Sequence, residues 1–362
     1  MTRGASLVLQ IIPRISHQAD GVTDYALNLA KALLTNYDLR TVFATAERSQ
    51  VSQKDGFEIA ALTNAQTLPA RPLILHYVNY GYQKRGLPFS LVTALRQVRQ
   101  RCSGRVLVIF HELFASGPPW KSEFWLEPLQ KKIARDVAQL ADGRLVSSES
   151  MREMLRHIAP GPDAIVHPIP SAFGEPVIDV GQLRGRDNRR WLICGGTQVI
   201  ERSLRSFLGI INAIPSAVAP KELRVVGGTE NPEVRRMLLT RPDVRSEYHP
   251  AVSAEEASQI LSTCAFGWLE YFTNRKAKPD LLLKSSSFAN MCANAVVCVM
   301  PQASGPISLA GDALPGPFTI AHDEVKMPSA SNRHAVGHAI YEWYHRHASI
   351  ASLAQVVAEK LA

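Results

Sequence analysis

Short apolar runs alternate with amphipathic stretches along almost the whole chain, and this alternation constrains the fold more than any other feature. Residues 7–12 (LVLQII) and 105–110 (RVLVIF) have the pattern of buried strands, and residues 25–34 place apolar side chains at helical spacing. The pattern restarts at residue 191, after a stretch rich in glycine, proline and charge. Strands that alternate with helices form parallel sheets covered on both faces. The sequence therefore predicts an α/β protein of two doubly wound domains that face each other across a cleft.

The length of 362 residues supports this division, because a single core rarely grows past about 250–300 residues. We expect a first domain, a linker, a second domain and a pair of closing helices that pack back on the first domain. The predicted boundaries are 1–172, 173–190, 191–340 and 341–362, in that order.

The composition, with 46% apolar and 20% charged residues, is that of an ordinary globular protein. The five cysteines form no C-x-x-C pair, and we expect them to be reduced thiols of a cytoplasmic protein. The first apolar run is short and ends at Pro13, so no secretory leader is expected. No apolar run reaches the roughly 18 residues that span a bilayer.

Residues 279–301 (PDLLLKSSSFANMCANAVVCVMP) combine an amphipathic helical stretch with a buried apolar strand. Asp280, Lys284 and Ser285 fall where we expect the helix to begin. The first turn of a helix carries unpaired N–H groups and a positive partial charge, so it suits a phosphate, and Lys284 adds a full charge. The alternative interpretation is a capped helix with a solvated lysine.

Other predicted strands also end in loops with glycine or histidine, at the edge where parallel sheets bind ligands. Gly21 and Val22 follow the first strand, and a glycine there lets a ligand approach the backbone closely. His111 follows the strand at 105–110, where it is placed to face a cleft, although a hydrogen-bonded loop histidine explains it equally well. In the second half, Gly196 and Gly227 follow two further strands.

The net charge is +8, and residues 84–105 hold six basic residues and no acidic one. We expect Lys84, Arg85, Arg96 and Arg99 to contact an anionic acceptor or an anionic membrane surface. A solvated helix face is the alternative. The segment lacks interleaved aromatic residues and no binding motif accompanies it, so nucleic acid is not expected as a partner.

Taken together, these motifs resemble those of the family 4 glycosyltransferases, a retaining group with the GT-B fold of two Rossmann-like domains. The resemblance is divergent and covers most of the chain. Residues 20–25 (DGVTDY) are similar to the family's G-G-V-G-x-Y loop, and His111 with Glu112 resembles its His-Asp or His-Glu pair. The resemblance implies that Gly21 and Val22 offer backbone groups to the donor and that His111 contacts the sugar near the reacting carbon.

In the second half, residues 195–203 (GGTQVIERS) resemble the family's G-R-x-x-x-x-K-G segment. Arg202 falls on the lysine that binds the donor diphosphate, and Thr197 replaces the arginine. The helix-and-strand segment is similar to the donor-binding E-x7-E segment, with Asp280 at the first glutamate and Phe288 at the second. The second glutamate normally holds the ribose hydroxyls, and phenylalanine cannot accept a hydrogen bond. Either another group holds the ribose or the donor is bound differently.

The resemblance thus implies a metal-independent, retaining glycosyltransferase of the hexosyltransferase type, with a nucleotide-sugar co-substrate and no cofactor. No clustered carboxylates or histidine pairs with metal-ligand spacing are evident in the sequence. The implied catalytic residues are His111 and Asp280, and the implied donor-binding residues are Gly21, Val22, Gly196, Thr197, Arg202, Gly227, Lys284 and Ser285.

The leading hypothesis is transfer of a sugar from a nucleotide-sugar to a glycan or lipid-linked acceptor in bacterial surface polysaccharide synthesis. The enzyme would act in the cytoplasm, peripherally on the inner face of the membrane. Two alternatives remain open. The departures at Thr197 and Phe288 favour a degenerate transferase that acts as a binding or scaffold subunit. A nucleotide-sugar 2-epimerase shares the fold but needs several acid/base carboxylates, for which Glu112, Glu270 and Asp280 are the candidates.

Overall fold

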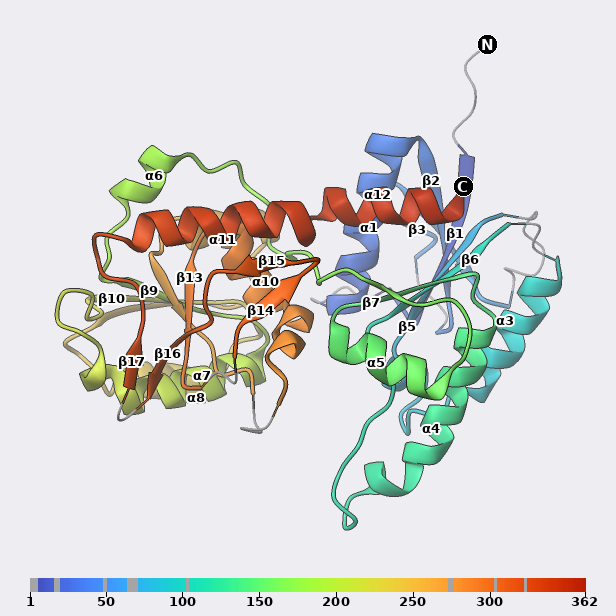
Figure 1. Ribbon diagram of the computed structural model, residues 1–362, viewed down its shortest axis with the longest axis horizontal. Coiled ribbons are helices and arrows are strands. Elements are labelled where there is room, and N and C mark those ends of the chain that lie inside the picture. The colour runs from blue at the N-terminus through green and yellow to red at the C-terminus, as the bar shows by residue number, and fades with distance from the viewer. Residues whose placement is uncertain are drawn as a thin grey trace. The chain divides into compact units, whose positions relative to one another are not determined.

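The computed structural model describes residues 6–15, 20–47, 51–63, 71–101, 104–272, 277–302, 305–321 and 324–362. The chain forms two compact units, each built around a largely parallel sheet (Figure 1). Unit 1 comprises Met1–Pro168 and Ile350–Ala362, and unit 2 comprises Ile169–Ser349. The predicted α/β class with two doubly wound, Rossmann-like domains is confirmed.

Unit 1 contains an eight-stranded sheet in the order β3-β4-β2-β1-β5-β6-β7-β8, with β3 antiparallel to its neighbour. The first strand lies inside the sheet, and the chain then builds outward on one side before it returns to the other. The topological switch point therefore falls between β1 and β5, where ligands bind at the carboxyl ends of the strands. The strands are β1 (Ser6–Ile12), β2 (Leu39–Thr45), β3 (Gln53–Lys54), β4 (Phe57–Ala61), β5 (Leu73–Tyr77), β6 (Val106–Phe110), β7 (Gly143–Val146) and β8 (Ile165–Val166).

Helices cover both faces of this sheet, with α3, α4 and α5 in a row on one face and α1 packed beside α12 on the other (Figure 1). One short helix, α2, follows β5 directly at residues 79–82. The Tyr82 hydroxyl donates to the His76 carbonyl at 2.9 Å and thereby holds this turn against β5. The helices are α1 (Gly21–Tyr37), α2 (Asn79–Tyr82), α3 (Phe89–Arg101), α4 (Ser122–Gln139), α5 (Glu149–Ile158) and α12 (Ile350–Leu361).

The two faces of the unit 1 sheet differ in chemistry, because alternate strand residues point to opposite faces. Leu9 and Ile11 of β1 join the apolar core together with α3, α4 and α5. Their neighbour Gln10 is polar, and so are Thr41 of β2 and His76 of β5. All three are completely buried.

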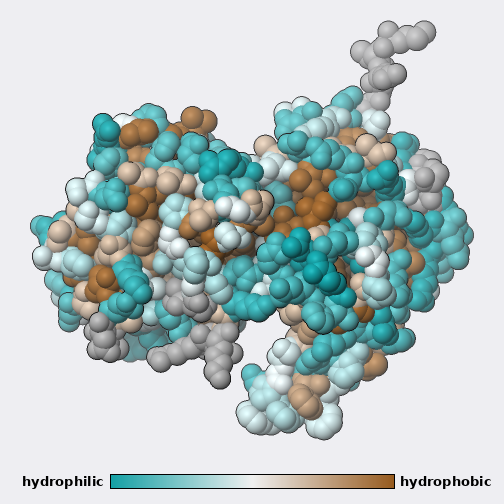
Figure 2. Space-filling view, in the orientation of Figure 1, coloured by the Kyte–Doolittle hydropathy of each residue, from teal (hydrophilic) through white to brown (hydrophobic). Residues whose placement is uncertain are grey.

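Each unit also has an apolar core of its own, and hydrophilic residues cover most of the face shown in Figure 2.

Unit 2 contains a seven-stranded sheet in the order β11-β10-β9-β12-β13-β16-β17, with β17 antiparallel, and a separate hairpin of β14 and β15. Its first strand, β9, is again internal, so the switch point falls between β9 and β12. The strands are β9 (Arg190–Cys194), β10 (Glu222–Val226), β11 (Arg245–His249), β12 (Phe266–Trp268), β13 (Val297–Met300), β14 (Ile307–Leu309), β15 (Asp312–Leu314), β16 (Phe318–Ala321) and β17 (Glu324–Lys326).

In unit 2, α7 and α8 lie on one face of the sheet, and α10 and α11 lie on the other with α6 beside α11 (Figure 1). Helix α6 forms inside the stretch interpreted as a linker, where Asp179 and Gln182 make a reciprocal capping box. The helices are α6 (Val180–Gly185), α7 (Thr197–Ile210), α8 (Pro232–Leu238), α9 (Ala254–Leu261), α10 (Ser286–Ala293) and α11 (Arg333–His347), with 3-10 turns η2 (Ile211–Ala213) and η3 (Pro279–Lys284).

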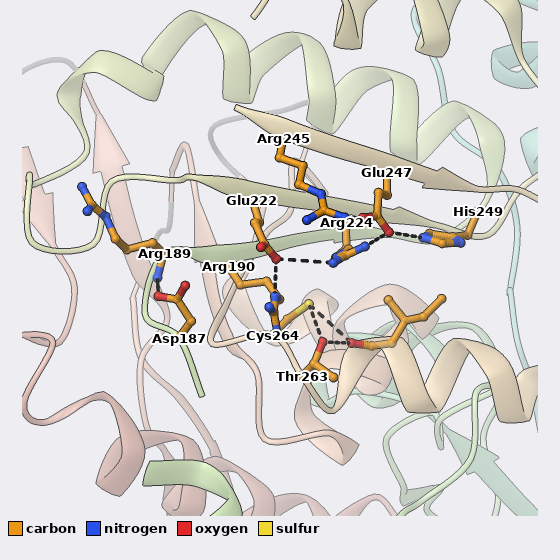
Figure 3. A network of polar contacts seen from close by, with 11 residues as sticks. Asp187, Arg189, Arg190, Glu222, Arg224, Arg245, Glu247, His249, Thr263 and Cys264 are labelled. Carbon is orange, nitrogen blue, oxygen red and sulfur yellow. Dashed lines mark hydrogen bonds and ion pairs between the residues drawn. The ribbon is translucent and has the colours of Figure 1, made fainter. Parts of the chain in front are cut away.

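A ladder of ion pairs crosses β9, β10 and β11 (Figure 3). Arg190 pairs with Glu222 at 2.6 Å, and Arg224 pairs with both Glu222 and Glu247. Residues opposite each other in the register explain these pairs, since Glu222 faces Arg190 and Arg224 faces Glu247. The ladder makes the sequence of β11 polar and charged, and for that reason the apolar pattern did not reveal this strand.

Two further observations concern the described part of the chain. Its four cysteines, Cys194, Cys264, Cys292 and Cys298, are buried and unpaired, and Cys102 lies outside the described residues. None of its helices is long and apolar enough to cross a membrane, and it contains no group of three or more His, Cys, Asp or Glu side chains that could hold a metal ion.

Candidate active site

Three loops of unit 2 meet at the carboxyl edge of its sheet. Gly195 follows β9 with φ +139°, and a Cβ atom there would lie 2.2 Å from Ser287 Oγ at the start of α10. Gly227 follows β10 with φ +101°, and a Cβ atom there would lie 2.7 Å from the Gly195 carbonyl oxygen. Glycine is needed at both positions, because the backbone conformation and the close approach each exclude a side chain. The loops after β9 and β10 are thus in contact with each other and with α10.

The amino terminus of α7 opens onto this meeting point. Gly196 is its N-cap residue and supplies no side-chain hydrogen bond, so the first-turn amides of α7 lack a side-chain cap among the described residues. Thr197 is the first residue of the helix, and its Oγ1 accepts a hydrogen bond from the Thr229 amide at 2.9 Å. Thr197 therefore ties the loop after β10 to α7. An uncapped helix start with a positive partial charge is suited to an anion.

The second helix start, that of α10, differs from the expected one. A 3-10 turn, η3, breaks the predicted helix, and α10 begins only after Ser285, whose Oγ accepts from the Phe288 amide at 3.2 Å. Lys284 ends η3 half-buried, and its ammonium makes no hydrogen bond or ion pair with any residue that the structure describes. Asp280 lies half-buried in the first turn of η3. Phe288 is buried in the apolar core of unit 2.

Arg202 connects helix α7 to the loop after β12, beside the switch point. Its Nε donates to the Glu270 carbonyl at 2.8 Å, and its Nη2 donates to the Tyr271 carbonyl at 3.3 Å. The adjacent Ser203 Oγ accepts from the Glu270 amide at 3.0 Å. Helix α7 thereby fixes the loop after β12 through three hydrogen bonds. Two guanidinium nitrogens of Arg202 donate to backbone carbonyl oxygens. The remaining N–H groups of this positively charged guanidinium can still donate hydrogen bonds.

Glu270 was not among the predicted donor-binding residues. Its backbone is held on both sides, since its amide bonds Ser203 and its carbonyl bonds Arg202. The side chain is half-buried, and its carboxylate makes no hydrogen bond or ion pair within the described ranges. The carboxylate of Glu270, which lies on a fixed backbone two residues after the central strand β12, can accept hydrogen bonds from ligand hydroxyls. An acidic residue immediately after a buried strand was the available sequence signal.

In unit 1, His111 belongs to a row of polar side chains. Its Nε2 lies 3.1 Å from Nδ1 of His76, and His76 Nε2 lies 2.8 Å from Oε1 of Gln10. The Tyr25 ring meets the His111 ring edge-on, with 4.8 Å between centroids. Burial, together with the neighbouring His111, holds the pKa of His76 well below its usual value, so His76 is neutral. The local sequence pattern points to His111 but not to Gln10 or His76, because those two residues lie within apolar runs.

The amino terminus of α1, where Gly21 and Val22 were predicted to offer backbone groups, already holds an anionic group. Asp20 is the N-cap residue, and its Oδ1 accepts from the amides of Val22 and Thr23 at 3.1 Å. Arg14 pairs with the same carboxylate at 3.0 Å. A ligand phosphate that used the Val22 amide would therefore have to displace Asp20.

The predicted basic residues divide into two pairs. Lys84 and Arg85 are exposed in the turn between α2 and α3. Arg96 lies 3.4 Å from Asp136 of α4, and Arg99 Nη2 lies 2.6 Å from Asp142 before β7. The hydrogen bond from Arg99 is the main cause that lowers the pKa of Asp142. Two of the four predicted positive charges are therefore paired with acidic residues that are distant in sequence. These acids, Asp136 and Asp142, lie outside the segment 84–105, which contains no acidic residue.

Comparison with solved structures identifies the fold. An α-glucosyltransferase in complex with UDP and a 13-mer DNA containing an HMU base matches with a TM-score of 0.62 at 12% identity, covering 98% of this chain and 99% of its own. A trehalose-6-phosphate protein from E. coli bound with UDP-2-fluoro glucose gives 0.59 at 10% identity, with 98% and 99% covered. WaaG, a glycosyltransferase involved in lipopolysaccharide biosynthesis, gives 0.52 at 11% identity, with 98% and 99% covered. The chain therefore has the GT-B fold, as the resemblance implied. No protein-family model and no curated protein sequence matches it.

The prediction that nucleic acid is not a partner is wrong. The α-glucosyltransferase that shares this fold holds DNA together with UDP, and a further structure of an α-glucosyltransferase, with a TM-score of 0.55 at 12% identity, holds UDP-glucose and DNA containing an abasic site. The prediction depended on the lack of a basic segment with interleaved aromatic residues and of a known binding motif. In this fold, the lack of both is not a valid reason to exclude nucleic acid.

Proposed function

We propose that this protein is a glycosyltransferase that binds a nucleotide-sugar donor in unit 2, with the diphosphate at the meeting point of the loops after β9 and β10 and the start of α10. The observation that supports this most directly is the uncapped amino terminus of α7, which lies beside the start of α10 at the carboxyl edge of the sheet. Two helix starts and the Lys284 ammonium give this edge a positive potential without any metal ion.

The proposed chemistry depends on charge that develops during the reaction. When the bond between the sugar and the donor diphosphate breaks, negative charge accumulates on the departing phosphate. The α7 amides, Lys284 and the remaining N–H groups of Arg202 would stabilise that charge, and such preorganised donors favour the transition state over the bound substrate. We infer that transfer is metal-independent and retains the anomeric configuration, the latter by resemblance alone.

We assign the donor hydroxyls to two carboxylates. Asp280 would bind hydroxyls of the sugar, as its place in the family's segment implies. Phe288 is buried in the core and cannot take the ribose role, so we assign the ribose hydroxyls to Glu270, whose backbone is held by two hydrogen bonds. A carboxylate that accepts two vicinal hydroxyls fits this role.

We place the acceptor in unit 1, with His111 in contact with the sugar near the reacting carbon and Lys84 and Arg85 toward an anionic acceptor or membrane surface. A glycan or lipid-linked acceptor in surface polysaccharide synthesis, at the cytoplasmic face of the inner membrane, remains our proposal. The corrected prediction on nucleic acid makes DNA an acceptor that the assay must include.

The first experiment measures donor binding. Lys284→Met is matched with Lys221→Met, an exposed lysine of unit 2 that precedes β10 and therefore lies at the opposite edge of the sheet. In calorimetry over a panel of UDP-, GDP- and TDP-sugars, we expect Lys284→Met to weaken the best donor at least about tenfold, or about 1.4 kcal/mol. We expect Lys221→Met to leave affinity unchanged. Equal affinities for both variants and the parent would remove Lys284 from the site.

The second experiment separates enzyme from scaffold. Purified protein is incubated with the best donor and with glycan, lipid-linked and HMU-containing DNA acceptors. Transfer to any acceptor supports the transferase. Donor binding without transfer or release of nucleotide diphosphate supports a binding subunit, and conversion of the donor without acceptor supports the epimerase. Absence of donor binding throughout the panel would refute the proposed site.

A further inference from the structure

A continuous row of hydrogen bonds crosses four neighbouring strands of unit 1 on the face covered by α1. Thr41 lies on β2, Gln10 on β1 and His76 on β5, and His111 directly follows β6. Gln10 Nε2 donates to Thr41 Oγ1 at 2.9 Å, Gln10 Oε1 contacts His76 Nε2 at 2.8 Å, and His76 Nδ1 contacts His111 Nε2 at 3.1 Å. The row runs from the middle of the sheet to its carboxyl edge.

Burial of polar side chains inside this sheet costs free energy that apolar side chains would not cost. Gln10, Thr41 and His76 are each 0% exposed, in strands whose other residues are almost all apolar. Burial of an unpaired amide or imidazole costs several kcal/mol, and only pairing along the row removes that cost. A valine or leucine at these positions would fill the same core. The row is thus best explained by its effect on the orientation and protonation of His111, the member that reaches the carboxyl edge of the sheet.

The hydrogen-bond directions along the row are coupled. Gln10 uses its NH₂ group on Thr41, so its carbonyl oxygen faces His76 and accepts from His76 Nε2–H. A neutral imidazole has one donor and one acceptor nitrogen, so His76 Nδ1 must accept from His111 Nε2–H. His111 therefore carries a proton on Nε2.

We propose that Gln10 and His76 are positioning residues that fix the ring orientation of His111 and commit its Nε2 proton to the His76 ring. The Tyr25 ring of α1 meets both imidazoles edge-on and so packs against the same two rings. This assignment of protons stands on the hydrogen-bond geometry of unit 1 and on the neutral state of the buried His76 ring. That His111 acts on a sugar or an acceptor hydroxyl rests on the proposed function.

The test is spectroscopic and uses the full-length protein labelled with ¹⁵N in histidine. Long-range ¹H–¹⁵N correlation spectra should show His111 as the Nε2–H tautomer, with a scalar coupling to His76 Nδ1 through the N–H···N bond. His167, which contacts Ser352 and the Pro168 carbonyl, serves as the internal reference. Absence of that coupling in the unmodified protein would overturn the proposal without any variant.

Two substitutions test the direction of the row. Gln10→Leu removes the acceptor of His76 Nε2–H, so we expect His76 to move its proton to Nδ1 and His111 to switch to the Nδ1–H tautomer. Gln10→Glu keeps an acceptor oxygen but places a negative charge beside His76, which favours a charged ring that donates from both nitrogens, so His111 should switch to the Nδ1–H tautomer there as well. Gln130→Leu, a completely buried glutamine of α4 outside the row, controls for loss of a buried amide and should leave His111 unchanged. A His111 tautomer that is unaffected by Gln10→Leu in a folded protein would refute the inference.

The two proposals can fail separately. The expected tautomers in a protein that binds no nucleotide-sugar would leave the positioning role intact and remove the glycosyltransferase. Sugar transfer at the parent rate by Gln10→Leu, despite a switched tautomer, would show that the committed Nε2 proton is not needed for transfer and would overturn the part of the inference that concerns the ligand.

Discussion

Gly195→Ala tests the contact from which the candidate site is built. The added Cβ atom would lie 2.2 Å from Ser287 Oγ, at a backbone angle of φ +139° that side chains rarely adopt. Backbone strain of this kind costs about 1–3 kcal/mol, and overpacking adds about 1–3 kcal/mol. We therefore expect a loss of about 2–6 kcal/mol in the free energy of unfolding of unit 2.

Two further variants divide this loss into its parts. Ser287→Ala removes Oγ and leaves the serine Cβ 3.4 Å from the new methyl group, an ordinary contact. In the double variant with Gly195→Ala it should therefore recover the overpacking part, about 1–3 kcal/mol, and leave the backbone strain. Gly196→Ala is the matched control, because a Cβ atom there meets nothing within 4 Å and φ is −73°. Its cost should stay within about 1 kcal/mol.

Urea unfolding followed by tryptophan fluorescence measures these effects. Trp191 and Trp268 are buried in unit 2, and replacement of the exposed Trp120 and Trp125 by phenylalanine removes the strongest background from unit 1. The midpoint and slope of the unit 2 transition then give each free energy. Equal costs for Gly195→Ala and Gly196→Ala, or no recovery in the double variant, would show that the loop after β9 does not meet α10.

Three other predictions concern stability. Burial keeps His76 neutral by holding its pKa well below the usual value, while the unfolded chain takes up a proton below about pH 6.5. Stability should therefore fall as the pH drops below that value, by about 1.4 kcal/mol per pH unit from this residue, and His76→Asn should remove that part of the slope in urea unfolding at about pH 5–7. Arg144 is 3% exposed and donates five hydrogen bonds to backbone carbonyls, so Arg144→Met should cost about 3 kcal/mol or more. A thermal unfolding midpoint within about 2 °C of the parent would contradict this, because a shift of that size corresponds to a loss of only about 1 kcal/mol in a domain as large as unit 1. Arg224→Met leaves Glu222 and Glu247 without their shared partner, so in urea unfolding it should lower stability by about 1–3 kcal/mol, and by less in about 1 M salt if the ladder is screened.

The alternation of strands and helices was predictable because parallel strands are buried on both faces and appear as continuous apolar runs. The strands β1, β5, β6 and β9 followed from this rule. The strands β4 and β11 did not, since FEIAA is interrupted by charge and RSEYH has none of the expected pattern. In β11 the charged residues pair across the sheet, and no local signal shows that partner.

The candidate site was only partly predictable for a related reason. Single residues at strand ends, such as His111 and Lys284, can be recognised from local pattern. The hydrogen bonds that build the site around them join distant parts of the chain, since Gln10 and His76 are 66 positions apart and Arg202 and Glu270 are 68 positions apart. The local pattern was also insufficient at Asp20. The resemblance of residues 20–25 to a glycine-rich loop did not indicate that the Asp20 carboxylate would cap α1.

The membership of α12 in unit 1 has a consequence for how the protein is made. This helix, the last in the chain, packs against α1, one of the first, and unit 2 is inserted between them in sequence. During synthesis, the surface of α1 that binds α12 stays uncovered until residues 350–362 leave the ribosome, whereas all residues of unit 2 leave it earlier. A fragment that ends at Pro168 should therefore aggregate, and supplying residues 350–362 as a separate peptide should improve its solubility.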